Sequence, residues 1–218
     1  MRTRLSLAVA ALLCCAATGW AQPSDNTAAD NVTTGKTWDF AASVSGYIIP
    51  DEDGYASPVF TADHNQLHLE GRYNYEAMHT GSTWIGYNFN FGKRVEFTVT
   101  PMVGGVFGDM TGVAPGYTVS IDWKKVAFWT SGEYVFDTNT KDGNFFYNWS
   151  ELSYSIKDWV RAGLVIQRTK AYQTDLDVQR GFLVGVNHKN VNFTTYVFNA
   201  GWTDPTVVLT LSWSFSPK

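Results

Sequence analysis

The sequence predicts an all-β protein, a single antiparallel up-and-down β-barrel of about twelve strands that crosses a membrane. Three observations lead to this prediction. From Trp38 onward, apolar and polar residues alternate along most of the chain, which is the period of a strand with one apolar face. No segment shows a sustained helical period. Short and long connections alternate along the chain between these stretches, as expected for strands that run between two rims.

The first four expected strands lie between residues 38 and 91. Trp38–Ile49 alternates cleanly and ends at an acidic, proline-containing loop. Ser57–Asp63 is short and is the weakest strand of the chain. Without it, Trp38–Ile49 loses its hairpin partner and the count falls to about ten. Gln66–Met78 places leucines and tyrosines opposite charged residues, and Thr83–Phe91 places aromatic residues opposite asparagines.

The next four expected strands follow the same pattern. Arg94–Phe107 alternates but contains Pro101, which cannot donate a ladder hydrogen bond, so a bulge or a weak ladder is expected there. Gly116–Trp123, Val126–Asp137 and Phe145–Ile156 each place aliphatic and aromatic residues on one parity. Serine, threonine and acidic residues occupy the other parity.

The last four expected strands are Trp159–Thr169, Val178–His188, Val191–Asn199 and Thr206–Phe215. The final strand alternates over its whole length and ends in two aromatic residues. About ten residues is also the length at which a tilted strand crosses a bilayer. An ordinary amphipathic strand of a soluble β-sandwich has the same pattern, so the other strands and their connections have to decide between the two folds.

The connections fall into two kinds that alternate along the chain. Tight turns are expected at His64-Asn65, Gly92-Lys93, Lys124-Lys125, Lys157-Asp158 and Lys189-Asn190. Longer loops are expected at Pro50–Ala56, His79–Ser82, Asp109–Pro115, Thr138–Asn144, Lys170–Asp177 and Ala200–Pro205. Short turns on one rim and long loops on the other are the asymmetry of outer-membrane barrels. A soluble secreted β-sandwich, the alternative fold, gives no reason for such segregation.

From Trp38 to Phe215, the chain therefore resembles the bacterial outer-membrane β-barrel proteins at the level of architecture, although no motif points to a subfamily. The resemblance implies a Gram-negative outer membrane as the location and membrane lipid as a partner. It also implies that the barrel-assembly machinery recognises the C-terminal strand. Ser216, Pro217 and Lys218 depart from the pattern, because they follow the terminal aromatic residue.

The N-terminal segment predicts export. Residues 1–21 have a basic start, an apolar run and a small-residue cleavage site, which is typical of a Sec-type signal peptide. Residues 22–37 are polar and aperiodic, so we expect a flexible periplasmic lead-in before the barrel at 38–218. Both cysteines lie in the signal, which leaves no disulfide framework. Acidic residues outnumber basic ones by 20 to 16, and no basic cluster predicts nucleic-acid binding. The mean hydropathy of −0.16 fits a barrel wall with only one apolar face.

Charged residues on the polar parity predict a charged lumen. The expected lumen-lining or pore-lining residues are Glu70, Arg72, Glu76, Arg94, Glu96, Glu133, Glu151 and Arg161. Two interpretations remain open. In the first, these charges line a small-solute channel or binding barrel that takes a small hydrophilic solute. In the second, they neutralise one another and fill the lumen of a structural or interaction barrel.

Other candidate sites are weaker. Arg168 and Arg180 flank the Lys170–Asp177 loop with outward parity, which suggests a loop-side binding site. His68 is the one histidine on the inward parity of a strand, but no serine is placed to serve it as a nucleophile. We therefore assign no catalytic residue, although a barrel enzyme remains a lesser alternative. No pattern indicates a metal site or a cofactor.

Overall fold

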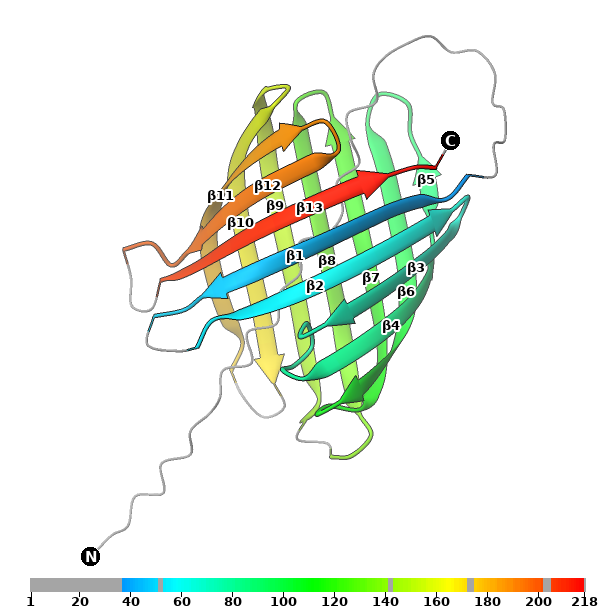
Figure 1. The fold of residues 1–218 in the computed structure, drawn as a ribbon, viewed down its shortest axis with the longest axis vertical. Coiled ribbons are helices and arrows are strands. Elements are labelled where there is room, and N and C mark those ends of the chain that lie inside the picture. Colours follow the sequence, from blue (N-terminus) through cyan, green and yellow to red (C-terminus); the bar gives the residue numbers. More distant parts are fainter. Residues whose placement is uncertain (1–36, 51–52, 141–142, 172–174, 202–204, 218) are drawn as a thin grey trace, which may run out of the picture.

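The computed structural model describes residues 37–50, 53–140, 143–171, 175–201 and 205–217. The expected signal peptide and all but the last residue of the lead-in lie outside these ranges. The described chain forms an antiparallel sheet whose strands cross the wall obliquely (Figure 1). The strands are β1 (Asp39–Ile48), β2 (Tyr55–His64), β3 (Leu67–Tyr73), β4 (Thr80–Tyr87), β5 (Phe89–Phe91), β6 (Glu96–Gly108), β7 (Gly112–Trp123), β8 (Val126–Asp137), β9 (Phe145–Lys157), β10 (Val160–Ala171), β11 (Asp177–His188), β12 (Val191–Phe198) and β13 (Thr206–Phe215).

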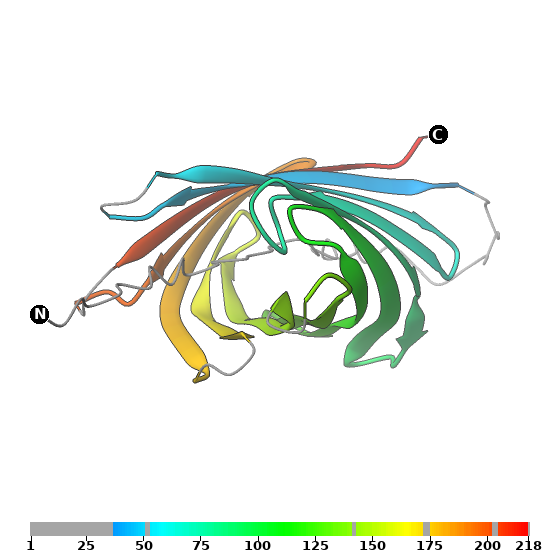
Figure 2. The same cartoon turned by 90° about the horizontal axis from the view of Figure 1, so that it is seen from below.

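The sheet closes on itself. Apart from β4 and β5, strands that are neighbours in sequence pair with each other, and β1 pairs with β13, with Ser43 opposite Ser212. Both β4 and β5 pair with β6, so they are successive parts of one barrel strand and the ring has 12 strands. Figure 2 shows this ring from below, with the β1 and β2 side flatter than the opposite wall. Closure removes every sheet edge, which a strand structure in lipid requires.

The break between β4 and β5 lies opposite Pro101. Gly86 of β4 faces Met102, and Phe89 of β5 faces Val99, so the register is the same on both sides of the break. Proline has no backbone N–H to continue the ladder. The weak ladder predicted at Pro101 is thus confirmed.

The two faces of the wall differ in polarity, as the alternation predicts. Outward apolar side chains are exposed around the ring; examples are Val44, Phe60, Ile85, Phe107, Phe136, Leu152, Leu164, Phe182, Phe193 and Leu211. Exposed apolar surface of this extent exceeds what a soluble monomer presents and matches the lipid-facing band of a membrane barrel. In the part of the chain that the structure describes, no helix is long and apolar enough to cross a membrane.

The structure confirms one expectation about strand boundaries and corrects two others. β2 is a full strand, so the count of twelve holds over ten. The expected loop Asp109–Pro115 is wrong, because β7 already begins at Gly112 and Pro115 lies opposite Val103. The glycines and proline there suggested a loop, yet they occupy strand positions. The expected strand Gln66–Met78 is too long, since β3 ends at Tyr73 and a connection follows.

Candidate functional site in the barrel lumen

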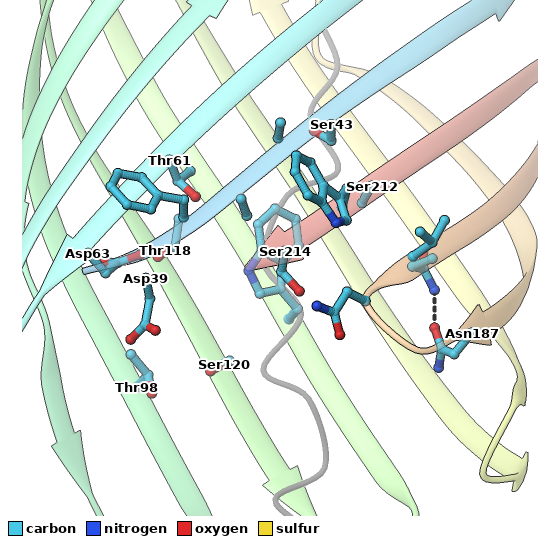
Figure 3. A pocket seen from close by; sticks show the side chains of 18 of the residues that line it. Asp39, Ser43, Thr61, Asp63, Thr98, Thr118, Ser120, Asn187, Ser212 and Ser214 are labelled. Carbon is cyan, nitrogen blue, oxygen red and sulfur yellow. Dashed lines mark hydrogen bonds between the residues drawn. The ribbon is translucent and has the colours of Figure 1, made fainter. Parts of the chain in front are cut away.

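A vestibule lined largely by polar residues occupies the short-turn end of the lumen. Its volume is about 670 Å³. Threonine, serine, asparagine and aspartate side chains point into it from β1, β2, β6, β7, β11 and β13 (Figure 3). Inward residues of these strands are small and polar because they occupy the parity opposite the apolar face. The cavity therefore offers many hydrogen-bonding groups to a solute.

Carboxylates dominate the charge of the vestibule. Its lining includes Asp39, Asp63, Glu70 and Asp158, against Lys189 and two histidines, His68 and His188. At its inner end, His68 lies between two of these acids. Its Nδ1 is 2.8 Å from Asp63 Oδ1, and its Nε2 is 3.4 Å from Glu70 Oε2. Both ring nitrogens thus face carboxylates, and neither is directed at a hydroxyl nucleophile.

Beyond the vestibule, Arg72 bridges the lumen. Its side chain leaves β3, where Nε donates to Glu70 Oε1 at 2.8 Å, and Nη1 reaches Glu133 Oε2 on β8 at 2.6 Å. Between these strands lie β4, β6 and β7, so the contact spans the barrel interior rather than neighbouring strands. All three side chains are buried. Charged pairs held this way depend on every partner, because an unpaired buried charge is costly.

The connection between β3 and β4 folds into the lumen and adds to the bridge. Tyr75 and Glu76 have no exposed surface. The guanidinium of Arg72 lies 4.1 Å from the Tyr75 ring centroid, and Glu76 Oε1 is 3.6 Å from Arg72 Nη1. Ser82 donates a hydrogen bond of 2.5 Å to the same oxygen. Glu76 therefore joins the Arg72 bridge although it lies outside any strand.

A second cluster joins β9, β10 and β12. Glu151 accepts hydrogen bonds from Trp149 Nε1 at 2.8 Å and from Tyr196 OH at 2.9 Å. Arg161 Nη1 lies 3.4 Å from Glu151 Oε2, and its Nη2 donates to Thr194 at 2.9 Å. An edge contact between Tyr75 and Tyr147, 6.0 Å between centroids, joins the β3–β4 connection to β9, the strand that carries Glu151. Together they form a cross-lumen layer, which is the name we use below.

Small residues make room for this layer. Trp84 projects inward from β4, with its ring 4.4 Å from the Arg72 guanidinium. A Cβ at Gly104 would lie 2.4 Å from that indole, and a Cβ at Gly116 would lie 2.9 Å from it. The two glycines thus form a slot in the wall for the tryptophan. Packing this close specifies the position of Trp84 and, through it, of Arg72.

The structure brings together six of the eight expected lumen residues, all of them buried; these are Glu70, Arg72, Glu76, Glu133, Glu151 and Arg161. Arg94 and Glu96 are not among them. Arg94 lies exposed in the connection before β6, and Glu96 is the exposed first residue of β6, opposite Asp122. The strand starts two residues later than expected, after Gly92 with φ +105°, so both side chains sit at the rim.

Sequence reasoning missed the inward aromatic side chains. Trp84, Trp149 and Tyr196 lie on the polar parity of their strands and are buried in the cross-lumen layer. Their parity was the available signal, since each falls between outward residues. Arg168 and Arg180 are exposed on the outward face, as their parity indicated. In the described ranges, no group of three or more His, Cys, Asp or Glu residues could hold a metal ion.

Comparisons with known proteins agree with this architecture. No protein-family model and no curated protein sequence matches the chain. Among solved structures, the KdgM porin superposes with a TM-score of 0.58 at 12% identity, covering 80% of this chain and 99% of that chain. The NanC porin gives 0.54 at 11% identity, covering 79% and 98%. One KdgM structure is a complex with disordered oligogalacturonate. At these identities the likeness shows the fold, and the chain has the barrel fold of these porins.

Proposed function

We propose that this protein is a small-solute channel or binding barrel in the outer membrane of a Gram-negative bacterium. The observation that carries the proposal is the vestibule of about 670 Å³ lined by hydrogen-bonding side chains. A cavity of this size holds a small hydrophilic molecule. The porin fold of the barrel supports the same assignment.

The charge of the vestibule favours neutral or cationic solutes. Four carboxylates line it, against one lysine and two histidines. Fixed charges at a pore attract ions of opposite sign and repel those of the same sign. The KdgM porin, by contrast, is found with an oligogalacturonate, an acidic sugar chain. We therefore infer that the present barrel takes a different class of solute from that one.

In this proposal, the solute path beyond the vestibule crosses the cross-lumen layer. Arg72 and Glu133 span it directly, and the β3–β4 connection fills the space beside them with Tyr75 and Glu76. A solute leaving the vestibule must pass this layer. Because Tyr75 lies on a connection rather than in the wall, its removal widens the path without breaking a strand ladder.

Liposome swelling tests the proposal. Proteoliposomes are exposed to sugars and to cationic and anionic amino acids of similar size. We expect neutral and cationic solutes to enter faster than anionic ones, and Tyr75→Ala to raise all the rates. Tyr73→Ala is the matched control, because Tyr73 is exposed on the outward face of β3. Absence of swelling with both the wild-type protein and Tyr75→Ala would overturn the channel.

A structural barrel with a filled lumen is the second candidate. The contacts of the cross-lumen layer favour it, since Arg72 and Glu133 meet across the interior at 2.6 Å. The two functions differ in one respect that can be measured. A filled barrel does not pass solutes, and truncation of Tyr75 does not make it permeable. A narrow channel passes solutes, and truncation of Tyr75 raises the rate.

An enzyme is not favoured. The porins to which the barrel is similar are channels by name, and His68 is engaged by Asp63 and Glu70 on both ring nitrogens. Export by a Sec-type signal and recognition of the last strand by the barrel-assembly machinery remain predictions. Fusion of residues 1–21 to a reporter enzyme, assayed in the periplasm, tests the first.

A further inference from the structure

The outward face of β10 and β11 carries three basic side chains at its long-loop end. Arg168, Lys170 and Arg180 are all exposed, on a wall whose other outward residues are mainly apolar. Arg168 lies opposite Val178, and Arg180 lies opposite Ile166. The two arginines are thus diagonal neighbours on adjacent strands, with Cβ atoms roughly 7–8 Å apart. Lys170 follows on the same face, one step nearer the loop.

These cations have no ion pair within the described ranges of the chain. Asp177, an acidic residue near them on β11, lies on the opposite parity and accepts a hydrogen bond from Gln179. An arginine on a lipid-facing wall is strongly unfavourable at the bilayer midplane and much less so near the interface. The cluster therefore belongs at headgroup level. There, its charges can be neutralised by an anionic group from outside the described chain.

Arg168 lies at the edge of a hydrogen-bond network on β9. Asn148, on the outward face of β9, is only 4% exposed. Its Nδ2 lies 2.8 Å from Ser131 O and 3.0 Å from Thr130 Oγ1, and this turns Oδ1 toward Arg168 Nη1 at 3.5 Å. Ser150 donates to the same Oδ1 at 3.2 Å. This long contact directs the guanidinium toward Asn148 and leaves its other N–H groups free to meet a ligand.

Directly toward the membrane from the cations lies an apolar surface. Leu164, Phe182 and Val184 are exposed there, Phe182 to 61%. Cations above apolar side chains match a molecule with an anionic head and acyl chains. Two guanidinium groups suit a phosphate, because each can donate two parallel hydrogen bonds. A phosphomonoester carries nearly two negative charges, which complements this cluster better than the single charge of a phosphodiester.

We propose that Arg168, Arg180 and Lys170 bind the phosphomonoester headgroup of a lipid in the leaflet on the long-loop side. The acyl chains of that lipid pack on Leu164 and Phe182. The site lies on the outer wall, so it is separate from the vestibule and does not depend on passage of a solute.

Native mass spectrometry of the barrel in detergent tests this site. The probe is lipid A that carries both phosphates, compared with the same lipid after enzymatic dephosphorylation and with phosphatidylglycerol. We expect Arg168→Gln/Arg180→Gln to weaken binding of the phosphorylated probe by about tenfold or more, as the loss of charged hydrogen bonds implies. Because Arg168 contacts Asn148, Lys170→Gln/Arg180→Gln is a second variant that leaves that network intact, and it is expected to weaken binding as well.

Lys124→Gln/Lys125→Gln, at the opposite rim, is the matched control and should bind the probe as the wild-type protein does. Equal binding of dephosphorylated lipid A or of phosphatidylglycerol would overturn the proposal. Unchanged binding by both Arg168→Gln/Arg180→Gln and Lys170→Gln/Arg180→Gln would also overturn it. So would displacement of the lipid by inorganic phosphate alone. Migration of unboiled samples on gels shows that every variant is folded.

Discussion

Removal of the Arg72 charge is the sharpest test of the cross-lumen layer. Arg72→Gln shortens the side chain, removes its charge and leaves Glu70, Glu76 and Glu133 buried without their shared cation. In the native barrel, Arg72 donates to two of these acids, at 2.8 Å and 2.6 Å, and lies 3.6 Å from the third. The substitution should therefore destabilise the fold far more than loss of one hydrogen bond.

The size of the effect follows from burial. Breaking a buried ion pair by removing one partner costs about 3–5 kcal/mol. Glutamine can still donate one hydrogen bond to a carboxylate, which places the expected loss at about 3 kcal/mol, the lower end of that range. Adding Glu133→Gln to Arg72→Gln removes one of the buried carboxylates that have lost their cationic partner. The double variant should then be more stable than Arg72→Gln alone.

The assay is reversible urea unfolding in lipid vesicles, followed by tryptophan fluorescence and extrapolated to zero denaturant. Arg94→Gln is the matched control, since Arg94 is exposed at the rim, and its free energy of unfolding should change by no more than about 0.5 kcal/mol. If Arg72→Gln and Arg94→Gln destabilise the barrel equally, the cross-lumen bridge is refuted.

Two further predictions concern the wall. Gly104→Ala should cost about 1–3 kcal/mol, because its Cβ would lie 2.4 Å from the Trp84 indole, whereas Gly105→Ala, with nothing within 4 Å, should be neutral in the same unfolding assay. Phe182→Arg places a charge on the lipid face and should cost about 2–4 kcal/mol, while Thr118→Arg, which points into the vestibule, should cost clearly less. Equal losses within either pair would show that the inward and outward faces are misassigned.

The strands were predictable because each has one lipid-facing parity. β8 and β13 have the boundaries expected from alternation alone, and the seam between β1 and β13 follows from the need to close the sheet. Where glycine and proline serve packing instead of turns, as at the start of β7, the same reasoning extended the loop too far along the chain. Local composition does not distinguish a glycine that turns the chain from one that admits a neighbour.

The lumen was predictable in part. Parity fixes the face on which a side chain lies, so Glu70, Glu133 and Glu151 were expected inside. It does not fix which side chains meet across the barrel, because the Arg72–Glu133 contact depends on the relative height of β3 and β8. The sequence also did not predict that the β3–β4 connection folds into the lumen, since its residues continue the alternation of the strand before it.

Single-channel recording of the refolded protein in planar bilayers under a KCl gradient is the most direct test of a cation-favouring path through the lumen. We expect small stepwise conductance, with a reversal potential that shows preference for K⁺ over Cl⁻. Asp39→Asn/Asp158→Asn should reduce that preference, because both carboxylates line the vestibule. A bilayer that stays silent with both the wild-type protein and Tyr75→Ala, or a preference for Cl⁻, would contradict a cation-favouring solute path through this barrel.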